Sequence, residues 1–385
     1  MREPIAGLNR AVLTWARERS GLTVAQVAEK LGKDPEVVAG WEVGPSGPTY
    51  PQLEKLAYDV YKRPVAIFFF PEPPAELDVD QSFRTLPDAE IAGLSPQTRY
   101  RVRQARAMQL ALYALNDGRN PAGSLVFRDI VVSLDSPGQA AAYVRDYPGV
   151  SLDVQQTTWR TVADALRGWR DSVENRGVFV FKHTFKQRDV SGFCLHDPEF
   201  PIIYVNNSTP ETRQVFTILH ELGHLLVGSS GITKVDDHFI AGLTGRARAI
   251  ELFCNRFAAE VLLPAASLAR LSLGAVVDET QIADIAAQFK VSREVVLRRY
   301  RDQGAVTRAG YEDMVLRWRA QDEARSGGEG GNYYATQGGY FGQRFLKLAF
   351  GRYYQGTITV ERLADMLDVR PTNVFGLEPY MVEGR

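Results

Sequence analysis

The 385-residue chain has little that would tie it to an oxidising compartment, a membrane or a polyanion. Its two cysteines, Cys194 and Cys254, lie far apart in sequence, which argues against a disulfide scaffold. The formal net charge is −1, so no global charge draws the protein to nucleic acid or lipid. The apolar run at 66–70 is far too short to span a bilayer, and the N-terminus lacks the apolar core of a signal peptide. We therefore expect a cytoplasmic protein without a membrane partner.

Histidine is also scarce, with five in the chain, yet two of them form the H-E-x-x-H motif His220-Glu221-Leu222-Gly223-His224. Apolar residues around the motif recur at helical spacing, so it is expected on an amphipathic helix, with Thr209 as its cap and Pro210 at its first position. One helical turn apart, His220 and His224 point the same way and can hold one Zn²⁺. Glu221 beside them can accept a proton from a water that the ion activates.

A catalytic zinc needs a third protein ligand and an open position for water. The next expected helix, residues 249–264, carries Glu251, Cys254 and Asn255 on one face. Glu260 lies nearly opposite and is expected in solvent. Glu251 is therefore the predicted third ligand.

The sequence leaves alternatives for the third zinc ligand and for the oxyanion stabiliser. Asp236, Asp237 and His238 compete with Glu251 from the loop between the two helices. Cys254 is close enough to be a ligand, although a small buried thiol is the more ordinary role. No residue stands out as the oxyanion stabiliser, for which Tyr204 and His238 are weak candidates.

Together the two segments resemble the ImmA/IrrE family of metallo-endopeptidases. That family usually shows Glu-x-x-Ala-Asn-x-Phe-Ala-x-x-Leu-Leu-x-Pro after its H-E-x-x-H, and here Cys254 replaces the alanine. The resemblance implies that His220, His224 and Glu251 bind Zn²⁺ and that Glu221 is the general base. It also implies that the substrate is a helix-turn-helix transcriptional repressor, cut in a stress, mobile-element or defence response.

Residues 8–70 read as a bundle of short helices in which Gly32 and Lys33 form a turn. Helices are expected at 10–19, 24–31, 34–41 and 51–61. The stretch Leu22-Thr23-x-x-Gln26-Val27-Ala28-x-x-Leu31-Gly32, followed by Trp41-Glu42-x-Gly44, resembles the XRE (Cro/C1-type) helix-turn-helix family.

The expected recognition helix is poorly suited to DNA, because carboxylates facing phosphates oppose binding. Its exposed positions include Asp34 and Glu36, Glu42 follows directly, and Lys33 is the nearest cation. DNA binding and docking to a protein, including a repressor's own helix-turn-helix, therefore both stay open.

Between these regions the hydrophobic period changes from helix to strand. A basic helix is expected at 95–115 and two more helices within 135–175. The segments 177–181, 191–195 and 201–205 are rich in β-branched and aromatic residues and predict a small, largely antiparallel sheet packed on the zinc helix. An edge strand of such a sheet can pair with an extended substrate.

A second helix-turn-helix-like unit is expected at 280–301, with Ser292 as a cap. Its second helix carries Arg293, Arg298, Arg299 and Arg301, for which DNA contact and structural support are equally open. Helices follow at 345–354 and 360–367. Families with such a tail are sometimes encoded beside PIN-type nuclease toxins, so the resemblance leaves a toxin partner as a further possibility.

The sequence thus predicts an α+β fold that is mainly α. The expected parts are a helix-turn-helix domain at 1–72, a helical connector at 73–150, a zincin-like peptidase domain at 151–268 and a helical domain at 269–385. The predicted function is a zinc endopeptidase that cleaves a transcriptional regulator. The alternative is a DNA-binding regulator or antitoxin whose zinc site is structural or vestigial.

Overall fold

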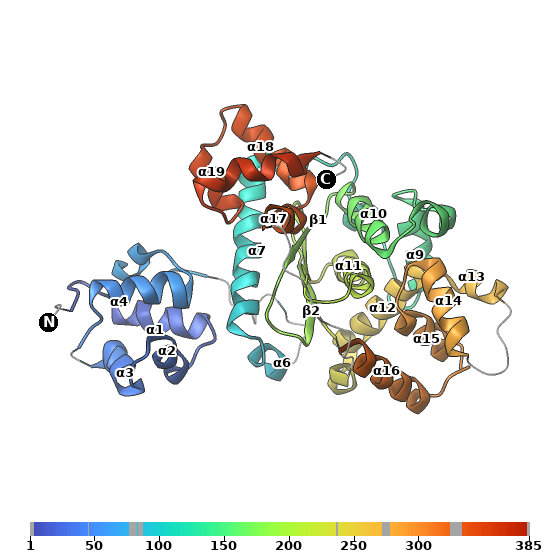
Figure 1. Cartoon of the computed structure of the whole chain (residues 1–385), viewed down its shortest axis with the longest axis horizontal. Helices are drawn as coiled ribbons and strands as arrows, with labels where there is room; N and C mark the ends of the chain where they lie inside the picture. The colour runs from blue at the N-terminus through green and yellow to red at the C-terminus, as the bar shows by residue number, and fades with distance from the viewer. Residues whose placement is uncertain are drawn as a thin grey trace. The chain divides into compact units, whose positions relative to one another are not determined.

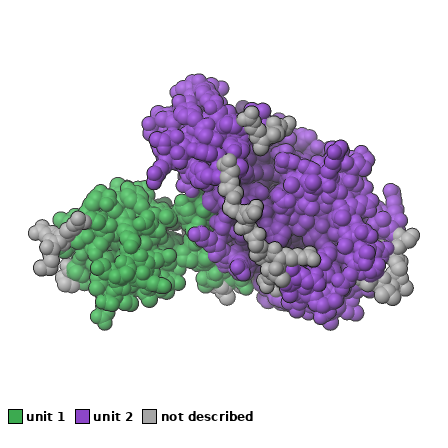
Figure 2. Space-filling model, in the orientation of Figure 1, with its two compact units in different colours: residues 1–104 green, residues 105–385 purple. Residues whose placement is uncertain are grey.

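The computed structural model describes residues 4–44, 46–76, 83, 88–235, 238–271, 278–323 and 333–382. The chain packs into two compact units, residues 1–104 and 105–385 (Figure 2). The fold is α+β and mainly α, as predicted (Figure 1). The finer division into four parts remains a prediction. Among the described residues, no helix is both long enough and apolar enough to cross a membrane.

The N-terminal unit begins with short helices around one apolar core. They are α1 (Arg10–Arg19), α2 (Val24–Leu31), α3 (Pro35–Val43) and α4 (Tyr50–Glu54), which continues as a π-helix (Lys55–Tyr61) and is followed by a 3₁₀ helix (Val65–Phe69). Local sequence sets the turn between α2 and α3. Thr23 and Gln26 form a capping box at the start of α2, and Gly32 ends it at φ 64°, a left-handed conformation that favours glycine.

Glu42 does not stand beside the recognition helix as a free carboxylate. It is buried, and its two oxygens accept hydrogen bonds from Arg17 Nε at 2.7 Å and Nη2 at 2.9 Å. This paired contact ties α3 to α1. Glu42 is therefore not available to repel DNA phosphates. Asp34 and Glu36 are exposed and still oppose DNA binding by α3.

The second unit contains a four-stranded sheet in the order β1-β3-β2-β4. The strands are β1 (Phe179–His183), β2 (Val190–Leu195), β3 (Ile202–Asn206) and β4 (Gly231–Lys234). β2 pairs antiparallel with both β3 and β4, so the prediction of a largely antiparallel sheet is confirmed. The parallel β1–β3 ladder and the short edge strand β4 were not predicted.

Helices cover both faces of this sheet (Figure 1). On one face lies α11 (Glu211–Leu226), which carries the H-E-x-x-H motif and shares a core with Ile203 and Val205 of β3. On the other face lie α17 (Tyr333–Phe341) and α18 (Gln343–Tyr354), where Phe345 stands 5.3 Å from the ring of Phe181. The motif helix is therefore held against the sheet.

The start of α11 differs from the prediction. Its N-cap is Pro210, which has no side chain that can cap, and not Thr209. The Thr209 hydroxyl instead donates to the carbonyl of Asn206 at 2.8 Å, so it closes the turn that leaves β3.

The remaining helices complete the two units. They are α6 (Asp88–Ala92) and α7 (Pro96–Leu115), which crosses from the first unit into the second, then α8 (Val126–Asp129), α9 (Pro137–Asp146), a π-helical turn (Val154–Thr158), α10 (Val162–Glu174), η4 (His238–Gly242), α12 (Gly245–Leu262), α13 (Ala265–Arg270), α14 (Glu279–Phe289), α15 (Arg293–Asp302), α16 (Arg308–Glu323), α19 (Val360–Met366) and a 3₁₀ helix (Pro371–Met381). The helices α16 and α17 were not predicted. Ser292 caps α15 as expected, accepting from the amide of Val295 at 3.2 Å.

Two of the arginines expected on a basic α15 surface are instead buried. Arg299 pairs with Glu260, whose other oxygen accepts from the amide of Ala265 at 2.9 Å, so Glu260 does not lie free in solvent as predicted. Arg298 donates to the hydroxyl of Tyr311 at 3.2 Å. These two arginines therefore support the packing of α15 rather than an exposed basic face.

Glycine at position 192 lets α11 approach the sheet. A Cβ on Gly192 would lie 2.5 Å from Thr217 Cγ2 and 2.7 Å from the carbonyl oxygen of Tyr204. We expect Gly192→Ala to lower the free energy of unfolding by about 1–3 kcal/mol, because overpacking must push the helix off the strand. The control Gly138→Ala, at an exposed position of α9 where nothing outside the helix lies within 4 Å of the added methyl, should not lower the thermal midpoint. Equal midpoints for the two variants would contradict this close approach.

Candidate metal centre

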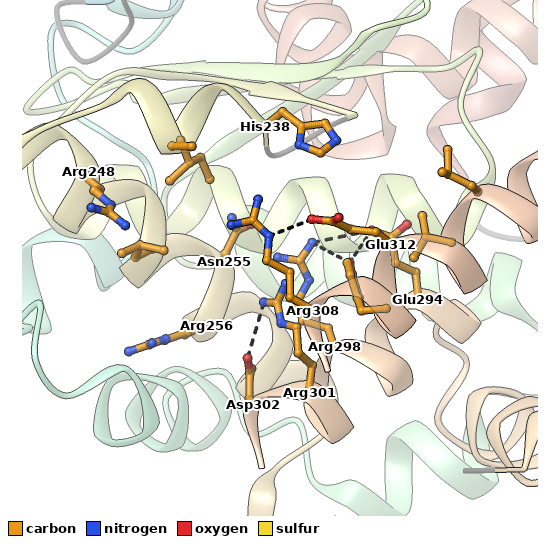
Figure 3. A pocket seen from close by; sticks show the side chains of 16 residues that line it. His238, Arg248, Asn255, Arg256, Glu294, Arg298, Arg301, Asp302, Arg308 and Glu312 are labelled. Atoms are coloured by element: carbon orange, nitrogen blue, oxygen red, sulfur yellow. Dashed lines mark hydrogen bonds and ion pairs between the residues drawn. The ribbon is translucent and has the colours of Figure 1, made fainter. Parts of the chain in front are cut away.

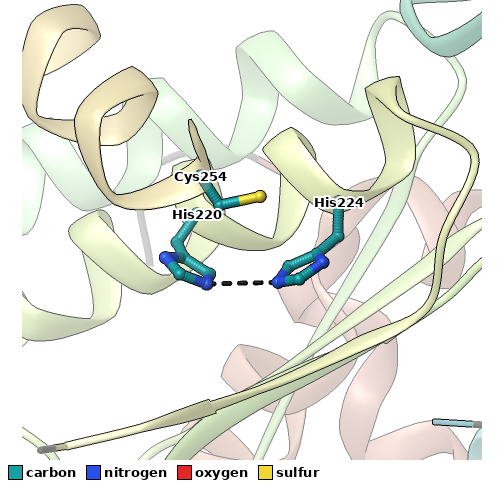
Figure 4. A group of neighbouring side chains, drawn as sticks. All are labelled: His220, His224 and Cys254. Carbon is teal, nitrogen blue, oxygen red and sulfur yellow. Dashed lines mark hydrogen bonds between the residues drawn. The ribbon is translucent and has the colours of Figure 1, made fainter. Parts of the chain in front are cut away.

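Three polar side chains of α11 are buried on its inner side. His220, Glu221 and His224 are each at most 2% exposed. Figure 4 shows the two imidazoles on one side of the helix with their ring nitrogens facing, and the distance between the two Nε2 atoms is 3.2 Å. The one-turn spacing of the motif thus brings both rings to a common point.

Both histidines have a partner for their other ring nitrogen. His220 Nδ1 donates to the side-chain oxygen of Asn255 at 3.2 Å, and His224 Nδ1 donates to Ser229 Oγ at 3.3 Å. When a metal replaces the Nε2 protons and each ring keeps its proton on Nδ1, each Nε2 presents a lone pair to the ion. Metal-binding histidines are typically oriented by hydrogen bonds of this kind.

Glu251 of α12 completes a triangle of donor atoms. Its carboxylate oxygens lie 3.5 Å from His220 Nε2 and 3.4 Å from His224 Nε2. Ligands at about 2.0–2.1 Å from a tetrahedral zinc lie roughly 3.3–3.4 Å apart, so these edges fit that ion. Burial alone would raise the pKa of Glu251, but the two imidazoles lower it to about 2. A buried carboxylate facing two imidazole lone pairs suits a divalent cation.

A thiol lies in the same place. The sulfur of Cys254 and the ring nitrogens of the two histidines all lie within 4.8 Å of one another. Glycine at position 223 permits this approach of α12 to α11, since a Cβ there would lie 3.1 Å from Cys254 Sγ. The centre therefore offers Cys254 as a second possible donor beside the carboxylate of Glu251.

Glu221 is positioned beside the donor triangle with one oxygen held and one unpaired. Thr233 Oγ1 of β4 donates to Glu221 Oε1 at 2.5 Å. Among the described residues, Oε2 has no hydrogen-bond partner. Burial raises the pKa of this carboxyl above its ordinary value, although the two histidines oppose the shift. The free oxygen can exchange a proton with a molecule placed at the centre.

Comparison with known families agrees with this geometry. Residues 173–301 match the metallopeptidase family model described as the IrrE N-terminal-like domain, and residues 13–57 match the model described as helix-turn-helix. The chain carries an IrrE-like peptidase domain and an N-terminal helix-turn-helix domain of the XRE type. No curated protein matches the chain.

The IrrE-like domain brings together the four site residues predicted from the sequence and Cys254, while Tyr204 and His238 lie apart from them. Tyr204 stacks on Phe193, with ring centroids 5.2 Å apart, and its neighbours Ile203 and Val205 face α11. It therefore points to the opposite face of the sheet, away from Glu221. His238 lies in η4 beside a neighbouring cavity. Asp236 and Asp237 lie outside the described residues.

Sequence reasoning missed the residues that orient the site. Asn255 stood on the correct helical face, but nothing distinguished it as a partner of His220. Ser229 and Thr233 follow the motif in a segment with no recognisable pattern. Their roles depend on the turn and edge strand that bring the chain back beside α11.

The two candidate third ligands can be separated by substitution. We expect Glu251→Ala to weaken zinc binding at least about 100-fold, beyond the effect of losing an outer hydrogen-bond partner. Cys254→Ala should retain the zinc, because Glu251 alone completes the donor triangle at 3.4–3.5 Å from both Nε2 atoms. Metal content after dialysis and competition with a chelator measure both. Full zinc retention in Glu251→Ala together with loss in Cys254→Ala would reverse the assignment.

Glycine at position 231 leaves room for the ring of His224. A Cβ on Gly231 would lie 2.6 Å from His224 Nε2, so Gly231→Ala should displace the imidazole and weaken zinc binding about 10- to 100-fold. Gly242→Ala, where nothing lies within 4 Å, is the matched control. Chelator competition compares the two variants, and equal affinities would show that His224 adjusts without cost.

Proposed function

We propose that the protein is a zinc-dependent endopeptidase. The observation that carries the proposal is the donor triangle of His220, His224 and Glu251 beside a buried carboxylate with one unpaired oxygen. Three protein ligands and an adjacent carboxylate are the components of a catalytic zinc site, whereas a purely structural site needs no base.

The chain's own residues supply orientation and proton transfer. A bound zinc ion would act as a Lewis acid, polarising the scissile carbonyl and making water more acidic. Glu221 accepts the proton of the attacking water at its unpaired oxygen and delivers it to the leaving amine. Thr233 fixes the other oxygen of Glu221, and Asn255 and Ser229 hold the two imidazoles. The site excludes bulk water, which strengthens each of these interactions.

Substrate binding is proposed at the sheet edge nearest the centre. β4 ends the strand order, and both Gly231 and Thr233 on it border the site residues. An extended peptide can add to such an edge through main-chain hydrogen bonds. Because the site residues are buried, part of the surrounding protein must move before a peptide reaches Glu221.

We further propose that the substrate is a transcriptional regulator of the helix-turn-helix class. Support comes from the IrrE-like domain and from its presence in one chain with a helix-turn-helix domain. The N-terminal domain would recruit that regulator or bind DNA beside it.

A second function is favoured by one observation. The complete burial of the centre and the thiol of Cys254 beside it resemble a closed structural zinc site. On this alternative the protein is a DNA-binding regulator or an antitoxin, and Glu221 has no chemical role.

The test compares wild type with Glu221→Gln, which keeps the zinc ligands and removes the base. We expect Glu221→Gln to bind zinc normally and to lose about 10²- to 10⁴-fold in cleavage rate. The exposed Glu361→Gln is the control for a generic loss of one carboxylate. Tagged Glu221→Gln protein is used to trap partners from the native cell. Wild-type protein with zinc is then added to the trapped partners, and their cleavage is measured.

A trapped regulator that wild type cuts and Glu221→Gln leaves intact supports the peptidase. Cleavage that continues at the wild-type rate in Glu221→Gln excludes this mechanism. A trapped protein or DNA fragment that is bound equally by both variants and never cut favours the regulator or antitoxin.

A further inference from the structure

A separate cavity lies beside α12 and adjoins the metal centre at Asn255. It has a volume of about 460 Å³, within the range of ligand-binding sites, and is lined by η4, α12, α15 and α16 (Figure 3). No residue of the donor triangle lines it. Asn255 does, and the same Asn255 side chain accepts the hydrogen bond from His220. A molecule in this cavity would contact Asn255, which is hydrogen-bonded to the proposed zinc ligand His220.

The walls of the cavity carry a surplus of positive charge. Five arginines and three carboxylates line it, which leaves a surplus of two cations. Each carboxylate already has an arginine partner. These ion pairs are Arg308–Glu312 at 2.8 Å, Arg298–Glu294 at 3.5 Å and Arg301–Asp302 at 3.5 Å.

The two remaining arginines, Arg248 and Arg256, are exposed and form no ion pair with any residue that the structure describes. Both come from α12, where they stand eight residues apart with Leu252 between them. Leu252 is 37% exposed, and on the facing helix Leu316 is 66% exposed. The cavity thus presents cationic and apolar contacts side by side, and no described carboxylate pairs with Arg248 or Arg256.

We propose that this cavity, the Arg248–Arg256 pocket, binds an acidic segment of the peptide substrate in which a carboxylate side chain lies next to an apolar one. Arginine binds carboxylates through paired N–H donors, and the two leucines take the apolar neighbour. The pocket then selects peptides by charge, which the main-chain pairing along an edge strand cannot do. This inference rests on the proposed peptidase function.

The test uses a proteome-derived peptide library in two experiments. Wild type with zinc is incubated with the library and the residues around each cut are counted. In parallel, immobilised Glu221→Gln protein is used to retain peptides without cutting them. We expect aspartate and glutamate to be enriched about fivefold or more at a fixed distance from the cut and among the retained peptides.

Charge reversal provides the decisive variant. In Arg248→Glu/Arg256→Glu the preference for acidic residues should disappear and be replaced by lysine and arginine. Arg246→Glu, an exposed arginine of the same helix that does not line the cavity, is the matched control and should keep the acidic preference. Unchanged thermal midpoints show that both variants are folded.

The outcomes separate this inference from the proposed function. Cleavage without any acidic preference, or with the same preference in the reversed variant, overturns the pocket and leaves the peptidase standing. A third outcome is that acidic peptides are retained only when both arginines are present, while wild type cuts no peptide. This outcome supports the pocket and contradicts the proposed peptidase function. Thermal stabilisation by inorganic phosphate that needs the same arginines, without acidic enrichment among peptides, assigns the cavity to a small anion and overturns the peptide proposal.

Discussion

The contact between α11 and α12 is the constraint on which the candidate metal centre depends. It buries two imidazoles and a carboxylate at hydrogen-bonding or ion-pairing distance, in surroundings where an unpaired charge would be costly. Gly223 permits the contact, since a side chain there would meet Cys254 and Phe257. A divalent cation would be the natural counterpart of this donor set, and the proposed function follows from that requirement.

The sheet packs against α11 and so supports its contact with α12. Gly192 lets α11 lie directly against β2, and Gly231 lets β4 pass the ring of His224. β4 also supplies Thr233, which holds Glu221. A short edge strand therefore contributes space at one residue and a hydrogen bond at another.

Several charged side chains of this protein are paired within the fold. Arg17 binds Glu42 within the helix-turn-helix domain, and Arg299 binds Glu260 between α15 and α12. A charged side chain at a sequence position expected to face a partner is thus no evidence of a binding surface until its neighbours are known. In the cavity beside α12, Arg248 and Arg256 are more informative, because no described carboxylate pairs with either of them.

The sequence by itself determined what depends on near neighbours in the chain. The bounds of α1 and α2, the cap at Ser292 and the placement of His220 and His224 on one helical face all follow from spacing and capping chemistry. The face that Glu251 shares with Asn255 follows in the same way.

The tertiary structure alone decided which distant segments meet. The parallel β1–β3 pairing, the edge strand β4, and Thr233 and Ser229 as partners of the site residues join parts of the chain that no local pattern relates. It also decided that Tyr204 points away from the site, because its direction depends on which face of the sheet α11 covers. Long-range contacts depend on which surfaces pack together. A single sequence indicates which face of each helix or strand is apolar, but it does not indicate which other face that surface packs against.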